Sequence, residues 1–95
     1  MNHLALVAVV AETAAMRYTP AGLPALDLRL EHDSQVTEAG QPRQVKFELK
    51  AVAFGAMAER LARQAIGSRW QFTGFLSNTR NGKGLLLHIQ HIEHA

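Results

Sequence analysis

The chain has 95 residues, a formal net charge of +2 and no cysteine. This length supports one hydrophobic core, so we expect a single domain over residues 1–95. The lack of cysteine excludes a disulfide framework and a thiolate metal site, and no stretch approaches the ~20 apolar residues of a membrane-spanning helix. These properties favour a cytoplasmic protein without membrane association.

The charge is distributed unevenly along the chain. Residues 1–42 contain two arginines against five acidic residues, whereas residues 43–95 contain eight lysines and arginines against three glutamates. The first part therefore has a net charge of −3 and the second a net charge of +5. This asymmetry favours an anionic partner, although many soluble domains show as much by chance.

Two strands are predicted in the first part of the chain. Leu4–Ala11 is nearly continuously apolar, which is typical of a strand covered on both faces or paired with another subunit. Residues 19–24, TPAGLP, have the composition of a turn. Apolar and charged residues then alternate from Leu26 to Glu31, which predicts the second strand. Asp33–Pro42 is polar and contains glycine and proline, so we expect a mobile loop.

The central stretch, residues 43–76, changes period twice. Apolar residues alternate with charged ones from Val45 to Ala51, which predicts the third strand. From Phe54 to Ala65 the apolar residues recur every three or four positions, which predicts a short amphipathic helix. We expect Gly67 to end this helix and Ser68–Leu76 to form the fourth strand.

The last strand follows a glycine-rich connection. Ser77–Gly84 contains Asn81-Gly82, a strong hairpin signal, and Leu85–Ile92 is predicted to be a strand. An all-β chain of five strands, with a short helix between strands 3 and 4, fits the five-stranded oligonucleotide/oligosaccharide-binding (OB) barrel. Closing the barrel also removes most exposed sheet edges.

Residues 53–76 resemble a passage of the bacterial single-stranded-DNA-binding proteins. The likeness lies in Phe54-Gly55, Ala58-Glu59, Gly67 and Gly74-Phe75-Leu76. Further segments resemble the primosomal replication protein N (PriB) family, a branch of that superfamily: Asn2-His3-Leu4, Thr19–Pro24, Leu30-Glu31-His32, Glu38-Ala39-Gly40, Arg43-Gln44 and Asn81-Gly82. The likeness extends over nearly the whole chain in one register.

The resemblance implies a non-catalytic single-stranded-DNA-binding accessory protein of the replication-restart primosome. Such a protein would stabilise the restart helicase on DNA, help to recruit the next primosomal protein, and form a homodimer through barrel strands. Two alternatives remain open. One is a general single-stranded-DNA-binding protein without an acidic tail, and the other is an OB-fold protein-interaction module with little nucleic-acid binding.

A barrel that binds single strands needs cations for the phosphates and flat side chains for the bases. Six cations on the third strand, in the last hairpin and in the first connection are the candidate DNA contacts: Arg17, Arg43, Lys46, Lys50, Arg80 and Lys83. The resemblance supports this choice, because similar proteins hold DNA with this face and this loop. We interpret Arg60 and Arg63 on the predicted helix as solvated charges.

The sequence departs from the family at its expected stacking residues. Similar proteins have aromatic residues roughly where this chain has Gln41 and Lys46, and often a basic residue where it has Asp33. Strand alternation places Phe47 inward. We assign Trp70 and the nearby Phe72 to the core. Binding should therefore depend more on electrostatic attraction than in the family at large.

The sequence shows no catalytic or metal-binding pattern. It contains no carboxylate pair, Ser-His-Asp order or phosphate loop with a following lysine, so we expect neither an enzyme nor a cofactor. His88, His91 and His94 are spaced by three residues, which on a helix would suit a metal. On a strand, alternation should put His91 on the face opposite to the other two, so no metal site is predicted.

Overall fold

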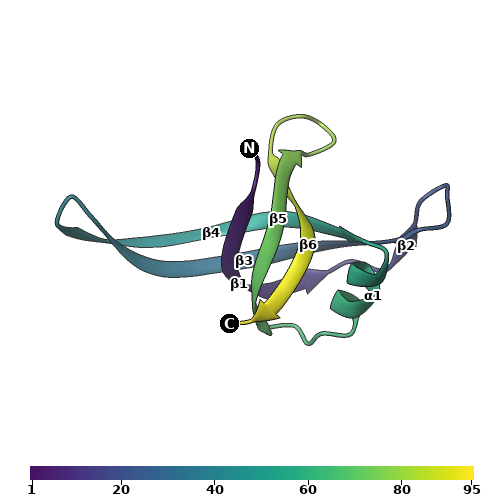
Figure 1. Ribbon diagram of the computed structural model, residues 1–95, viewed down its shortest axis with the longest axis horizontal. Helices are drawn as coiled ribbons and strands as arrows, with labels where there is room; N and C mark the ends of the chain where they lie inside the picture. The colour runs from purple at the N-terminus through teal and green to yellow at the C-terminus, as the bar shows by residue number, and fades with distance from the viewer.

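The computed structural model describes residues 1–95. Its elements follow the order β1 (Leu4–Thr13), β2 (Arg17–Tyr18), β3 (Pro24–Glu38), β4 (Gln41–Phe54), α1 (Ala56–Ala62), β5 (Arg69–Asn78) and β6 (Leu85–His94) (Figure 1). The predicted OB barrel is confirmed, with its helix between the third and fourth of the five long strands. The two-residue strand β2 was not predicted.

The five long strands close on themselves. The sheet order is β1-β5-β6-β4-β3, and β1 also pairs with β3, which completes the barrel. Strand β1 pairs with β5 from Leu4 to Val9 and with β3 from Val9 to Thr13, with a register shift between Val10 and Glu12. This irregularity bends β1, so that one strand belongs to both halves of the barrel.

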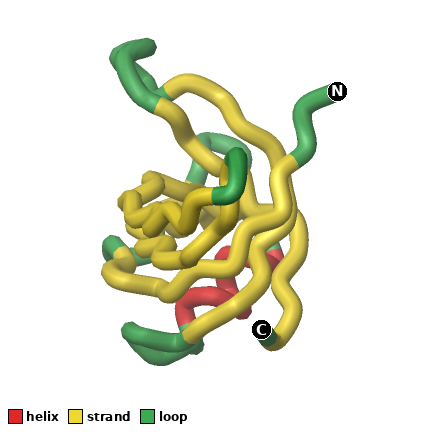
Figure 2. The backbone as a smooth tube through the Cα atoms, turned by 90° about the vertical axis from the view of Figure 1, so that its left-hand side faces the viewer, coloured by secondary structure: helices red, strands yellow, loops and turns green.

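The core fills the interior of the barrel. Its largest fully buried side chains are Phe72, Leu26, Leu30, Leu61, Leu87 and Ile92. Strand β1 contributes Ala8 and Val10, whereas Ala5 is exposed, so within the chain β1 is not covered on both faces. Helix α1 lies under one end of the strands and buries Ala58 and Leu61 there (Figure 2).

The helix is shorter than its sequence period predicts. It ends at Ala62, so the prediction that Gly67 ends the helix is wrong. Phe54, which the period placed in the helix, is the last residue of β4. Gly67 has φ 88°, and its N–H donates to the Val10 carbonyl at 2.7 Å. The glycine is needed because the chain must turn back onto β1 at this point with a positive φ, which costs glycine little.

Strands β3 and β4 form a long hairpin, so the predicted loop at Asp33–Pro42 is wrong. The strands stay paired from Ala25 opposite Phe54 to Glu38 opposite Gln41, and only Ala39 and Gly40 form the turn. Both turn residues have positive φ, as a two-residue hairpin turn requires. The outer half of the hairpin projects from the barrel (Figure 1) and is largely exposed, so it needs no alternation of apolar and polar residues.

A second register shift lies between β5 and β6. Thr73 is paired with His91 and Gly74 with Ile89, so Gln90 is an extra residue in β6. The bulge reverses the alternation of β6. His88 and His91 therefore share the outer face, whereas His94 packs on Trp70 with ring centroids 4.6 Å apart. The prediction that His88 and His94 share a face is wrong.

Nowhere in the structure do three or more His, Cys, Asp or Glu side chains lie close enough together to hold a metal ion. No helix in the structure has the length and apolar character needed to cross a membrane.

Candidate nucleic-acid interface

Three of the six predicted DNA-contacting cations are held by carboxylates of the same chain. Arg17 donates from Nε to Asp27 Oδ2 at 2.6 Å and from Nη2 to Asp27 Oδ1 at 3.1 Å. Arg43 Nε lies 2.6 Å from Glu38 Oε1, and Lys46 Nζ lies 3.8 Å from Asp33 Oδ2.

These ion pairs follow from the register of β3 and β4. The antiparallel hairpin places the acidic strand β3 beside the basic strand β4, with Asp33 directly opposite Lys46. Arg29 is likewise surrounded, at 2.8 Å from Glu48, 2.9 Å from Glu31 and 3.6 Å from Glu12. The charge asymmetry along the sequence is therefore largely cancelled on the hairpin.

Lys50, Arg80 and Lys83 form no salt bridge. Lys50 alternates with buried residues of β4 and faces outward. Lys50 and Lys83 line one hollow of about 610 Å³ at the mouth of the barrel, whose floor includes Leu4, Leu6 and Leu76. The structure thus brings two of the predicted residues to one surface, and Arg80 stands on the loop beside it.

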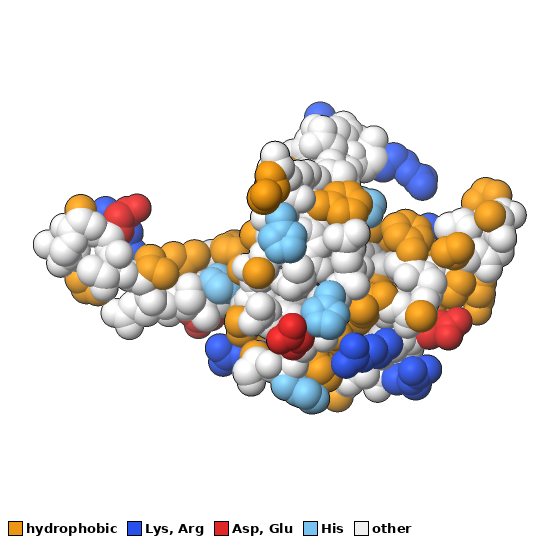
Figure 3. Space-filling model, viewed as in Figure 1, with side chains coloured by type: hydrophobic (Ala, Val, Ile, Leu, Met, Phe, Trp, Pro, Cys, Tyr) orange, Lys and Arg blue, Asp and Glu red, His pale blue; other side chains and the backbone are white.

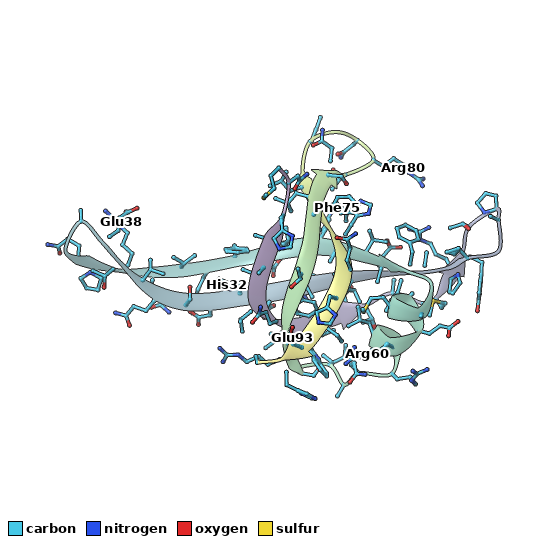
Figure 4. The ribbon with its side chains drawn as sticks, in the orientation of Figure 1. His32, Glu38, Arg60, Phe75, Arg80 and Glu93 are labelled. Atoms are coloured by element: carbon cyan, nitrogen blue, oxygen red, sulfur yellow. The ribbon has the colours of Figure 1, made fainter.

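The loop from Thr79 to Gly84 is held by its own side chains. Asn81 Oδ1 accepts from Thr79 Oγ1 at 2.8 Å and from the Lys83 N–H at 3.0 Å, while the Gly84 N–H donates to Thr79 Oγ1 at 3.1 Å. These bonds fix a turn on which Arg80 and Lys83 are exposed. In Figure 4 Arg80 extends outward from this loop, at the opposite end of the barrel from Arg60.

The charge of Arg80 also reaches the outer face of β3. The pKa of the Asp27 carboxyl is lowered from its ordinary value, chiefly by the hydrogen bond from Arg17 and further by the positive charges of Arg17 and Arg80. Arg60, which we interpreted as a solvated charge, has its guanidinium carbon 5.8 Å from the centroid of the Trp70 ring, within the range of a cation–π contact.

The aromatic side chains divide between the core and the surface. Trp70 and Phe72 are buried, so their assignment to the core is confirmed. Phe47 is 41% exposed, and the prediction that it packs inward is wrong. It does point to the core-facing side of β4, but at its position the hairpin extends past the barrel. Its ring stacks instead on His32, with centroids 4.8 Å apart.

Sequence reasoning missed a column of three rings on the outer face of the barrel. The Phe75 and His88 rings stack with centroids 4.5 Å apart and planes at 12°, and the Phe54 ring lies 6.1 Å from His88 at 27°. The hydroxyl of Ser77 lies 2.8 Å from His88 Nε2. The rings come from three strands, so no local pattern in the sequence indicates the column.

Comparison with known proteins places this arrangement in a family. A family model described as another single-strand binding protein family matches residues 2–91. The replication restart protein PriB of Bordetella pertussis is 50% identical over 91 residues, which cover 95% of this chain and 85% of that protein. The chain belongs to the PriB family. The resemblance expected from the sequence is thus confirmed.

Solved structures agree with the PriB assignment. PriB from Ralstonia solanacearum superposes with a TM-score of 0.89 at 42% identity, covering 99% of this chain and 97% of that one. The single-stranded DNA binding protein from Thermus aquaticus superposes with a TM-score of 0.76 at 26% identity, covering 98% of this chain and 49% of that one. The PriB barrel and the single-strand-binding barrel therefore share one fold.

Proposed function

We propose that this PriB-family protein is a non-catalytic accessory of replication restart that binds single-stranded DNA in the bacterial cytoplasm. The likeness to PriB proteins over nearly the full chain carries the proposal. The unpaired cations around the barrel mouth and the loop supply positive charge for phosphates, and the exposed rings of Phe47 and Phe54 supply flat surfaces for bases. Both requirements of a single-strand-binding barrel are present.

The test is a titration with fluorescent oligo-dT, read by anisotropy. The double variant Arg80→Ala/Lys83→Ala should weaken binding on the order of 10-fold at low salt, because two phosphate contacts are lost. Its thermal stability should hardly change, since exposed charges contribute little to folding. The matched control, Arg60→Ala/Arg63→Ala, removes the same charge at the other end of the barrel and should bind like the parent.

A different outcome would favour the protein-interaction module. The observation behind this alternative is that the chain's own carboxylates already hold Arg17, Arg43 and Lys46. If oligo-dT does not bind even at ~20 mM salt, where phosphate attraction is strongest, DNA binding is refuted and that alternative remains.

We further propose that the protein stabilises the restart helicase on DNA and helps to recruit the next primosomal protein. The projecting β3–β4 hairpin supports this, because it carries exposed ion pairs and Val36, which is 46% exposed, beyond the barrel. Unwinding of forked DNA by the restart helicase should rise when the protein is added. A general single-strand-coating protein would bind oligo-dT without raising the unwinding rate.

We also propose a homodimer. The half of β1 before Val9 pairs only with β5, so its other edge has no strand partner within the chain. Its outward side chains, including Ala5 and Val7, are only partly covered. A second copy can pair with such an edge. Sedimentation at micromolar concentration should give about twice the 10.4 kDa chain mass, and a single monomeric species would reject the dimer.

A further inference from the structure

We propose that the C-terminal end of α1 and the turn after it bind an acidic segment of a partner protein. Arg60 and Arg63 hold carboxylates of this segment, and Ile66 contacts one of its apolar side chains. These three residues, the helix-end patch, are all exposed. In Figure 4 Arg60 and Arg80 lie at opposite ends of the barrel, so the patch is separate from the proposed DNA contacts.

Local backbone hydrogen bonds place the two arginines of the patch one above the other. Helix α1 ends in a tight turn, in which the Arg63 N–H donates to the Arg60 carbonyl at 3.3 Å. In such a 3₁₀ turn, side chains three residues apart lie on the same side. The guanidinium groups of Arg60 and Arg63 can therefore reach a single bound segment.

A second turn presents the isoleucine three residues after Arg63. The Ser68 N–H donates to the Ala65 carbonyl at 3.1 Å, so Ile66 and Gly67 are the central residues of this turn. Gly67 has φ 88°, which a type II turn requires at its third position. The Ile66 side chain is 59% exposed at the corner of the turn and does not pack against the hydrophobic core. It is therefore available as an apolar anchor.

The charges of the patch are not neutralised by the chain itself. Neither Arg60 nor Arg63 forms a salt bridge, and Glu59, which directly precedes them, forms none either. Residues 56–70 contain three arginines and one glutamate, a net charge of +2. Figure 3 shows cationic side chains gathered over α1. Such an excess of positive charge favours an anionic partner.

One of the two guanidinium groups is already ordered. The guanidinium carbon of Arg60 lies 5.8 Å from the centroid of the Trp70 ring. Stacking of this kind restricts the guanidinium group, so less conformational freedom is lost when a carboxylate binds to it. An ordered guanidinium group can also donate two parallel hydrogen bonds to one carboxylate.

The patch suits a peptide better than single-stranded DNA. A surface that binds single strands presents aromatic rings on which bases stack. Trp70, which contacts Arg60, is only 6% exposed and its ring also packs on His94, so it is covered. The exposed side chain of the patch is instead aliphatic. Cations beside an exposed aliphatic group complement an acidic segment that carries apolar side chains.

The first experiment measures binding of a short fluorescein-labelled peptide of alternating aspartate and leucine by anisotropy. Arg60→Ala/Arg63→Ala should weaken its binding about 5- to 30-fold, because two ion pairs are lost. The matched control, Arg80→Ala/Lys83→Ala, removes the same charge at the other end of the barrel and should stay within about 2-fold of the parent. With oligo-dT the order of the two double variants should reverse.

The second experiment tests the apolar anchor. Ile66→Ser should weaken binding of the aspartate–leucine peptide about 3- to 10-fold and leave binding of polyglutamate unchanged, because polyglutamate has no apolar side chain to lose. Ile66 is largely exposed, so the thermal unfolding midpoint of this variant should stay close to that of the parent. Equal weakening of both ligands would contradict a role of Ile66 as the anchor.

The outcomes separate this surface from the proposed DNA binding. If the parent does not bind the aspartate–leucine peptide at ~20 mM salt, or if Arg60→Ala/Arg63→Ala binds it as the parent does, the peptide site is overturned and the proposed function stands. If Arg60→Ala/Arg63→Ala weakens oligo-dT binding as much as peptide binding, the patch is a path for DNA and the peptide assignment is wrong. Failure of the parent to bind oligo-dT, with the peptide still bound, would overturn the proposed function alone.

Discussion

Replacing Gly74 with alanine should destabilise the barrel strongly, because β6 leaves no room for a Cβ atom there. A Cβ built on Gly74 would lie 1.7 Å from the His88 carbonyl oxygen, 2.9 Å from its carbon and 3.3 Å from the Gln90 nitrogen. Real Cβ contacts are essentially never shorter than 3.0 Å, so the strands would have to move apart by about 1.3 Å. All three obstacles are backbone atoms, and no change of rotamer relieves them.

The expected magnitude follows from this clash. Overpacking a well-packed site costs about 1–3 kcal/mol and sometimes more, and a backbone clash at a bulge belongs at the upper end of that range. For a domain of this size each kcal/mol lowers the midpoint of thermal unfolding by about 4–8 °C, so we expect a fall of roughly 12–24 °C.

Two other glycines separate steric cost from conformational strain. Gly84 would place its Cβ 3.4 Å from the Thr79 side chain and needs no positive φ, so Gly84→Ala should change the stability by no more than about 0.5 kcal/mol. Gly82 has open space but φ 73°, so Gly82→Ala should cost about 1–2 kcal/mol. Thermal unfolding followed by circular dichroism ranks the three. A Gly74→Ala midpoint within about 4 °C of the parent, or above that of Gly82→Ala, would refute the reasoning.

The remaining predictions concern binding and surface charge. If the three unpaired cations make the phosphate contacts, log K for oligo-dT should fall with log salt at a slope of about −2 per protomer; a flat dependence contradicts this. The lowered pKa of Asp27 means that its ion pair stabilises the fold above the unfolded pKa and ceases to do so as the pH falls through the folded pKa. Asp27→Asn should therefore lower the stability at pH ~7 by less than about 1 kcal/mol, and this loss should shrink as the pH falls through the folded pKa; a loss that does not change with pH would be inconsistent with this. Ala39 has φ 50° in the hairpin turn, so Ala39→Asn should raise the melting temperature by a few degrees, and a decrease would argue against strain at that residue.

Local signals in the sequence determined most of the fold. Alternating residues marked the strands, the proline and glycine of residues 19–24 and Asn81-Gly82 marked the turns, and the apolar period marked the helix. Trp70 and Phe72 were correctly placed in the core. These features depend on neighbours a few residues apart, which is the range over which propensity and periodicity act. The family likeness was also present in the sequence alone.

The tertiary structure decided how strands meet, and thereby the nature of the surface. The register of β3 against β4 turned Asp33–Pro42 from an expected loop into a hairpin and paired Lys46 with Asp33. The bulge at Gly74 placed His88 against Phe75. Closure of the barrel brought Phe54 to the same column from a third strand. Such contacts join residues far apart in the chain, and their geometry is set by strand register and bulges, which no local pattern in the sequence specifies.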